Sequence, residues 1–114
     1  MNERSVGTLT EERASEYMTK QGYTVLARNY RAVTGEIDLI TQSPDGTIVF
    51  AEVKYRRSDR YGLPEEAVSL KKQETIRRTA LWYLRERKMS PETAVRFDVI
   101  AMDTNEIRWY RDAF

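Results

Sequence analysis

Charged side chains interrupt two segments that otherwise have the composition of buried β-strands, residues 35–40 (GEIDLI) and 49–57 (VFAEVKYRR). Side chains two residues apart on a strand point to the same side, so Glu52 and Lys54 share one face of the second segment. The sequence SPDGT between the two segments is typical of a hairpin turn. An antiparallel hairpin would bring Asp38 on one strand close to Glu52 on the other.

Two carboxylates and an ammonium group in this arrangement suggest a particular chemistry. Carboxylates that meet on a sheet repel each other unless a cation or a proton lies between them. Mg²⁺ takes one or two protein carboxylates and completes its shell with water and phosphate oxygens. With Lys54 placed to hold a phosphate or to orient water, the group predicts Mg²⁺- or Mn²⁺-assisted hydrolysis of phosphodiester bonds. The structural alternative is a plain ion pair between Glu52 and Lys54.

Two residue types are missing, and their absence narrows the chemistry. The chain has no cysteine and no histidine. Disulfides, thiolate nucleophiles, serine–histidine catalysis and histidine-based zinc sites are therefore excluded. Any catalysis must use carboxylates, lysine, tyrosine or hydroxyl groups, and carboxylates suit a hard metal ion.

The net charge is only +1, but it is unevenly distributed. Residues 54–88 contain eleven Lys/Arg and five Asp/Glu, a local charge of +6 (11 − 5). A basic segment of this kind fits a surface that binds a polyanion, and the alternative is a solvated helix with surplus charge. We predict contacts with nucleic acid from five basic side chains: Arg31, Arg56, Arg57, Lys71 and Lys72.

The order of elements predicts an α/β fold. Helices are expected at residues 8–22 and 64–88, and strands at 23–31, 35–42, 47–56, 94–103 and 106–114. The order α-β-β-β-α-β-β predicts a mixed five-stranded sheet flanked by helices, within a single domain of residues 1–114 whose residues 1–7 are flexible. No apolar run is long enough to span a membrane and no signal peptide is evident, so a cytoplasmic protein is expected.

Several residues in these elements have simpler structural interpretations. The second helix is expected to bury Leu70, Ile76, Ala80, Leu81 and Leu84. The aromatic residues Trp82, Tyr83, Trp109 and Tyr110 are assigned to the core rather than to base stacking. Asp98 either has a role in the site or pairs with Arg96 or with a backbone group. Glu36 is either an additional ligand or a partner of Arg31, and the structural role is favoured. Glu11 follows Thr8 by three residues, which is the spacing of a capping box at a helix start.

The chain resembles the YraN-like family of bacterial proteins, which belongs to the restriction-endonuclease-like nuclease superfamily. The resemblance runs nearly end to end and rests on EERASEYMTKQGYTVLARNYR, GEIDLI, VFAEVKYR, EEAVSLKKQETI, RFDVIA and the terminal DAF. It implies a restriction-endonuclease-like core and a metal held by Glu11, Asp38 and Glu52. It also implies catalytic roles for Asp38, Glu52 and Lys54.

The same resemblance extends to related Holliday-junction resolvases, which add a polar residue from the next helix. Gln73 is the candidate here, with Lys72 as the alternative. The family usually has a Gly-Glu pair where this chain has Thr10 and Glu11. Glu12 could therefore be the acid that is used in place of Glu11.

Three functions remain open from the sequence. The first is a nuclease that acts on DNA, and the resemblance to resolvases suggests structured DNA as its substrate. Cutting both strands of a duplex would favour a homodimer. The second is a nucleic-acid-binding module that keeps the fold without catalysis. The third is a protein-interaction domain in which the charged residues provide surface complementarity.

Overall fold

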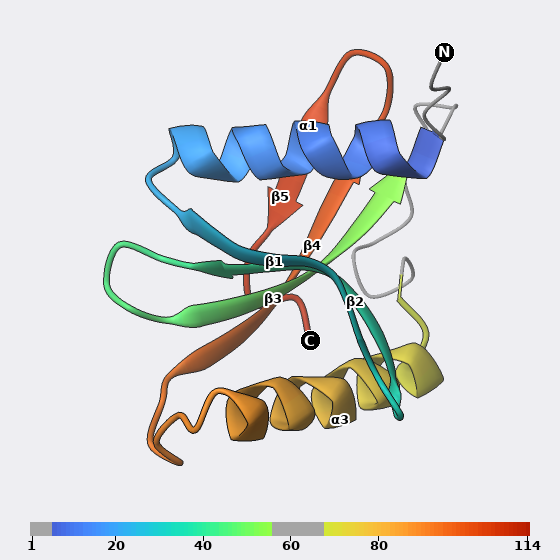
Figure 1. Cartoon of the computed structure of the whole chain (residues 1–114). Coiled ribbons are helices and arrows are strands. Elements are labelled where there is room, and N and C mark those ends of the chain that lie inside the picture. Colours follow the sequence, from blue (N-terminus) through green and yellow to red (C-terminus); the bar gives the residue numbers. More distant parts are fainter. Residues whose placement is uncertain (1–5, 56–67) are drawn as a thin grey trace, which may run out of the picture.

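The computed structural model describes residues 6–55 and 68–114, and it confirms the predicted order of elements (Figure 1). The helices are α1 (Val6–Lys20) and α3 (Leu70–Glu86), and the strands are β1 (Thr24–Ala32), β2 (Gly35–Gln42), β3 (Ile48–Tyr55), β4 (Val95–Met102) and β5 (Ile107–Tyr110). None of the helices in these residues is long and apolar enough to cross a membrane.

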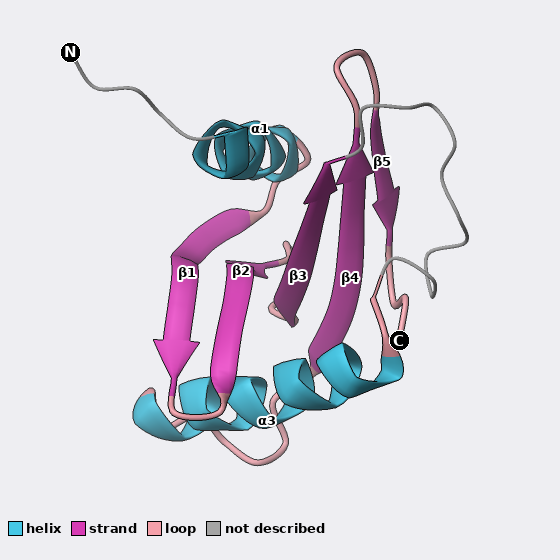
Figure 2. Cartoon of the chain, turned by 90° about the vertical axis from the view of Figure 1, so that its right-hand side faces the viewer, coloured by secondary structure: helices cyan, strands magenta, loops and turns pink. Residues whose placement is uncertain are grey.

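The five strands form one mixed sheet in the order β1-β2-β3-β4-β5. β1, β2 and β3 pair antiparallel in sequence, and so do β4 and β5, whereas β3 and β4 are parallel. Parallel neighbours cannot be joined by a tight turn and need a crossover connection. The segment that contains α3 makes this crossover on one side of the sheet, while α1 covers the other side (Figure 2).

Two hydrophobic clusters lie on the two faces of the sheet. The α1-side cluster contains Ala14, Met18, Tyr23, Leu39, Val49, Ala51, Ile100 and Met102. The α3-side cluster contains Ile37, Ile40, Ile48, Phe50, Val68, Ile76, Ala80, Tyr83 and Val99. Alternate residues of β3 enter alternate clusters, because neighbouring side chains of a strand point to opposite faces. Glu52 and Lys54 therefore lie on the α3 side, in line with Phe50.

β2 does not keep this alternation along its whole length. Leu39 packs on the α1 side, but Ile37 and Ile40 both pack on the α3 side. Strict alternation along the strand would place Ile37 and Leu39 on one face, and β2 departs from it. β2 bends near Asp38, and the β1–β2 pair leaves the direction of β3 and curls toward α3 (Figures 1 and 2), where its turn lies against Thr75 and Thr79.

Both helices begin at positions other than those predicted. α1 spans Val6–Lys20, so Thr8 lies within the helix rather than at its start. α3 begins at Leu70 rather than at Pro64, because the Ser69 hydroxyl caps the helix by accepting from the Lys72 N–H at 3.1 Å. Residues 64–67 of the predicted helix lie outside the described residues.

The predicted apolar face of α3 is partly wrong. Leu70 is 82% exposed and Leu81 is 52% exposed, and Trp82 is also on the surface. The positions that face the sheet are Gln73, Ile76, Thr79, Ala80 and Tyr83. These five follow the three- and four-residue spacing of one helical face, and two of them are polar, which the count of apolar residues alone could not anticipate.

Asp98 on β4 has the structural role that the sequence suggested. Its fully buried carboxylate accepts hydrogen bonds from the Arg96 guanidinium at 2.8 and 2.9 Å. It also accepts from Trp109 Nε1 at 2.8 Å and from the Asp112 N–H at 3.0 Å. The cluster ties β4 to β5 and to the C-terminal residues, and every bond satisfies a buried charge.

The turn between β1 and β2 docks against α3 through small side chains. Thr34 and Thr79 share a hydrogen bond between their hydroxyl groups at 2.8 Å. Gly35 has φ of +154°, and a Cβ atom there would lie 2.5 Å from Thr75 Cγ2. Glycine is therefore required at this position by backbone conformation and by the close approach of the helix.

We predict that Gly35→Ala destabilises the fold more than Gly46→Ala does. Gly46 also has a positive φ, of +94°, but nothing lies within 4 Å of its added Cβ. The Gly46 variant therefore reports backbone strain alone, of about 1–3 kcal/mol, and the excess loss at Gly35 reports the contact with Thr75. Chemical denaturation measures both values. Equal losses in the two variants would contradict the close docking of the turn on α3.

Candidate functional site

Asp38 and Glu52 meet where β2 and β3 separate. The antiparallel pairing of these strands ends at Leu39 and Ala51, so the next residue of each strand is Asp38 or Glu52. The Asp38 side chain takes over from the backbone ladder, because its Oδ2 accepts from the Val53 N–H at 2.9 Å. The predicted meeting of the two carboxyl groups is confirmed, and it occurs at the bend of β2.

Glu52 is buried without full hydrogen bonding. Its side chain is 6% exposed, and its Oε2 atom has no hydrogen-bond partner. Burial, together with the hydrogen bond and the negative charge of Asp38, raises the pKa of Glu52 to about 8. A buried acid with an unused oxygen beside a second acid is a donor set that fits a hard divalent cation, because the cation would replace the proton.

Two lysines lie close enough to act on this pair of acids. The positive charges of Lys72 on α3 and Lys54 on β3 both oppose the rise in the pKa of Glu52, and Lys72 has the larger effect. Both side chains are half-buried. The site therefore combines two carboxyl groups from adjacent strands with two ammonium groups, one from β3 and one from the first turn of α3.

Gln73 lies beside Lys72 but is held by the backbone. Its side chain is 7% exposed, and its Nε2 donates to the Val68 carbonyl at 3.0 Å. This bond fixes the chain just before α3 to the helix. Sequence analysis named Gln73 and Lys72 as candidates from this helix. Lys72 is the one that interacts electrostatically with Glu52.

Glu11 approaches the pair from α1 without joining it. Its Oε1 accepts from Asn29 Nδ2 at 3.1 Å. Burial raises the pKa of Glu11, and the negative charges of Asp38 and Glu36 add to the rise. Among the described residues, no three acidic side chains are close enough together to hold a metal ion. Glu12, the alternative acid, is half-buried on the same helix.

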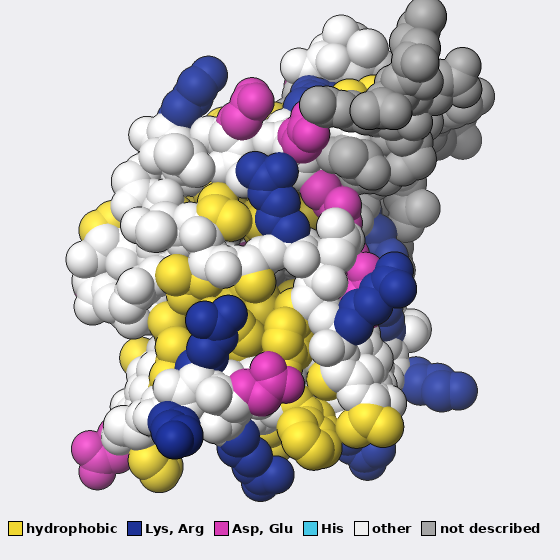
Figure 3. Space-filling view, viewed as in Figure 1, with side chains coloured by type: hydrophobic (Ala, Val, Ile, Leu, Met, Phe, Trp, Pro, Cys, Tyr) yellow, Lys and Arg dark blue, Asp and Glu magenta, His cyan; other side chains and the backbone are white. Residues whose placement is uncertain are grey.

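The basic residues that are both predicted to contact nucleic acid and described by the structure lie on β1 and α3. Arg31 is exposed and pairs with Glu36 at 3.5 Å, as the sequence suggested. Lys71 is exposed on the first turn of α3, and Arg56 and Arg57 lie outside the described residues. Figure 3 shows Lys/Arg and Asp/Glu side chains interspersed along the side of the molecule between α1 and the start of α3.

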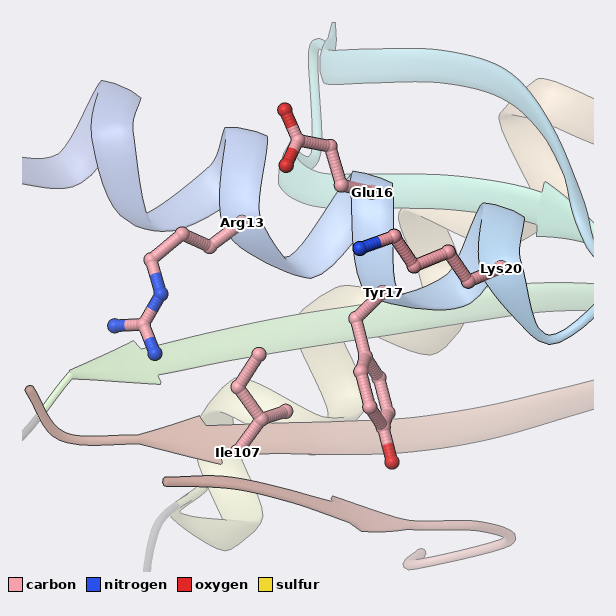
Figure 4. A pocket seen from close by; sticks show the side chains of 5 residues that line it. All are labelled: Arg13, Glu16, Tyr17, Lys20 and Ile107. Atoms are coloured by element: carbon pink, nitrogen blue, oxygen red, sulfur yellow. The ribbon is translucent and has the colours of Figure 1, made fainter. Parts of the chain in front are cut away.

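A separate hollow of about 140 Å³ lies between α1 and β5, lined by Arg13, Glu16, Tyr17, Lys20 and Ile107. In Figure 4, Arg13 and Tyr17 reach from the helix toward the strands, whereas Glu16 points away from them. Arg13 Nη1 donates to the Asp103 carbonyl at 2.8 Å. None of the lining residues belongs to the Asp38–Glu52 site, so the hollow and the acidic pair are different features.

Sequence reasoning missed Asn29, which contacts Glu11. The available signal was an asparagine within a segment of good β-formers, because Asn is depleted in strands and tolerates a left-handed backbone. The sequence also gave no means of ranking Lys72 above Gln73, because that ranking depends on where α3 begins.

The arrangement defines the class of fold. The chain superposes on the crystal structure of a repair endonuclease from Pyrococcus abyssi with a TM-score of 0.51 and 18% sequence identity. The match covers 92% of this chain but 41% of the Pyrococcus protein. With the mixed five-stranded sheet and the element order α-β-β-β-α-β-β, this is a restriction-endonuclease-like fold.

The sequence comparisons place the chain more closely. Residues 10–102 match the model of the family described as "Uncharacterised protein family UPF0102". A UPF0102 protein of Lachnoclostridium phytofermentans is 44% identical over 114 residues, which cover 100% of this chain and 96% of that protein. One from Trichlorobacter lovleyi is 46% identical over 99 residues, with 87% and 77% covered. The chain belongs to the UPF0102 (YraN-like) family.

We predict that Glu52 makes the protein less stable as pH rises. A pKa of about 8 in the folded protein, above the ordinary value of 4.5, means that the folded state holds this proton more tightly. The associated stability is fully present below pH 4.5 and is lost as pH rises through 8. When the pH rises from 5 to 8.5, the free energy of unfolding of the wild type should therefore fall relative to that of Glu52→Gln. The expected difference is on the order of 2 kcal/mol or more.

Urea denaturation at a series of pH values without divalent metal measures this difference. Glu92→Gln, at an exposed carboxyl group, is the matched control and should follow the wild type. A Glu52→Gln curve parallel to that of the wild type across this range would show that Glu52 is not buried as an acid.

Proposed function

We propose that the protein is a metal-dependent nuclease that hydrolyses phosphodiester bonds in nucleic acid. The observation that carries this proposal is the buried Glu52 carboxyl group, whose Oε2 has no partner, next to Asp38. A carboxyl group in that state is costly for a fold that needs it only for packing. A bound cation would offset this cost, because the unused oxygen would coordinate it and its positive charge would neutralise the two carboxylates.

In this proposal Asp38 and Glu52 hold Mg²⁺ or Mn²⁺. When bound, the ion would stabilise the negative charge that develops on a phosphate under attack. Asp38 is oriented by the Val53 N–H, which binds one of its oxygens, and Asp38 also shares a hydrogen bond with Glu52. Lys54 and Lys72 supply positive charge on the same side of the sheet, where they would bind the phosphate and orient an attacking water.

DNA is the nucleic acid that we propose as substrate. The solved protein with the same fold is described as a repair endonuclease, and the basic segment of residues 54–88 provides charge for a phosphate backbone. Lys71 and Arg31 are exposed on elements that border the site. We propose that they contact the nucleic-acid backbone on either side of the phosphate that reacts.

We predict that Mn²⁺ stabilises the protein saturably and that Asp38→Asn abolishes the effect. A ligand at 100 times its Kd stabilises the folded state by about 2.7 kcal/mol. Thermal unfolding over a series of Mn²⁺ and Mg²⁺ concentrations measures this. Glu92→Gln is the control for loss of an acid and should retain the full shift. Equal shifts in Asp38→Asn and the wild type would place the metal elsewhere.

We also predict cleavage of at least one labelled substrate in Mn²⁺ from a panel of single-stranded, duplex, flapped and four-way DNA and single-stranded RNA. Asp38→Asn and Lys54→Ala should each lower the rate by roughly 100-fold or more, because each removes charge next to the reacting phosphate. Lys20→Ala, at a lysine of the separate hollow, should cleave like the wild type.

The other outcomes separate the rival functions. Salt-sensitive binding of one substrate without cleavage would replace the nuclease by a binding module of the same fold. Cleavage that persists unchanged in Asp38→Asn would indicate a contaminant or another site. Neither binding nor cleavage of any substrate in the panel would remove nucleic acid from the proposal and favour a protein partner.

A further inference from the structure

Asn29 has an unusual backbone for a residue in a strand. Its φ is +49°, in the left-handed region that residues other than glycine rarely adopt. Two other residues in the described part of the chain that are not glycine share this sign, Lys88 and Asp112, and both follow the end of an element. Asn29 lies inside β1 instead, where a left-handed residue interrupts the pleat.

Asn29 on β1 lies directly across from Asp38 on the neighbouring strand β2. The pairs Arg28–Leu39 and Tyr30–Ile37 bracket it, so Asn29 and Asp38 are opposite each other. β2 loses its alternation at the same place, where Ile37 joins the α3-side cluster together with Ile40. Both strands therefore change direction across the Asn29–Asp38 position, and the bend separates β2 from β3.

The side chain of Asn29 contacts Glu11, the acidic residue of α1 near the Asp38–Glu52 pair. Its Nδ2 donates to Glu11 Oε1 at 3.1 Å, which ties α1 to the bend in β1. Asp38 acts electrostatically on the Glu11 carboxyl group, so Glu11 is held near the acidic pair with its Oε2 outside this hydrogen bond. Carboxylates that bind metals are commonly oriented by a hydrogen bond of this kind.

We propose that Asn29 is a positioning residue that holds Glu11 at the edge of the Asp38–Glu52 site, so that Glu11 can join the two acids around a divalent cation. This inference rests on the proposed function. Asparagine combines the two properties that the position needs, since it tolerates a left-handed backbone and carries an amide donor. Glycine would supply the backbone alone, and aspartate would place a second negative charge against Glu11.

The test compares Asn29→Gly, Asn29→Asp, Glu11→Ala and the double variant Asn29→Gly/Glu11→Ala. Isothermal titration with Mn²⁺ alone gives the affinity of each. Loss of an orienting partner typically weakens metal binding by about 10-fold or more, and we expect this for both Asn29 variants. The double variant should bind no more weakly than Glu11→Ala, because Asn29 acts through Glu11.

Lys88→Gly is the matched control. Lys88 has a φ of +52°, nearly that of Asn29, just beyond the end of α3. Glycine should relieve the same backbone strain at both positions without loss of folding stability, and only the Asn29 variant should lose metal affinity. A metal-free measurement accompanies it, since the NMR signals of the Asn29 side-chain amide should shift in Glu11→Ala.

Each alternative result decides one part. If Glu11→Ala weakens Mn²⁺ binding but Asn29→Gly does not, the role of Asn29 is wrong and the proposed function stands. Additive losses in the double variant would likewise mean that Asn29 does not act through Glu11. If the wild type binds no Mn²⁺, the proposed function fails, and the positioning role falls with it.

Discussion

The burial of Glu52 is the constraint around which the rest of the site is organised. β3 is the central strand of the sheet, with a helix over each face, so an acid in line with Phe50 enters the α3-side core. Removing a carboxyl group from water without full hydrogen bonding costs free energy. The neighbouring elements moderate that cost, since Asp38 shares a hydrogen bond with Glu52 and two lysines direct positive charge toward it.

The shape of the sheet follows from the same place. Beyond Leu39 and Ala51 the β2–β3 ladder stops, and the backbone N–H of Val53 would lack an acceptor if Asp38 did not provide one. The bend that stops the ladder is stabilised at two points. Asn29 accepts a left-handed backbone opposite Asp38, and Gly35 allows the end of the hairpin to dock against α3. Local backbone exceptions thus end the β2–β3 ladder beside the acidic pair, where a regular sheet would continue it.

Sequence patterns predicted the elements and the acidic pair, but not the details that depend on tertiary contact. The alternation around Glu52 and the turn before residue 48 were sufficient to place Asp38 beside it. The predicted start of α3 was wrong because the helix is capped by Ser69. The sequence offers several other possible cap residues, and no local pattern selects Ser69 among them. Strict alternation does not predict the face of Ile37, because it assumes a straight strand. The contact between Asn29 and Glu11 joins residues from different elements, and no local pattern specifies it.

Asp98 provides an internal comparison for Glu52. The two acids lie on adjacent parallel strands, where Ala51 pairs with Asp98 and Glu52 with Val99, and both are buried. Asp98 receives hydrogen bonds from a guanidinium, an indole and a backbone N–H, so its charge is compensated within the protein. Glu52 keeps an unused oxygen and has another acid as its nearest partner. The same sheet can therefore satisfy a buried carboxylate fully, and the incomplete bonding of Glu52 is a property of its site rather than of the fold.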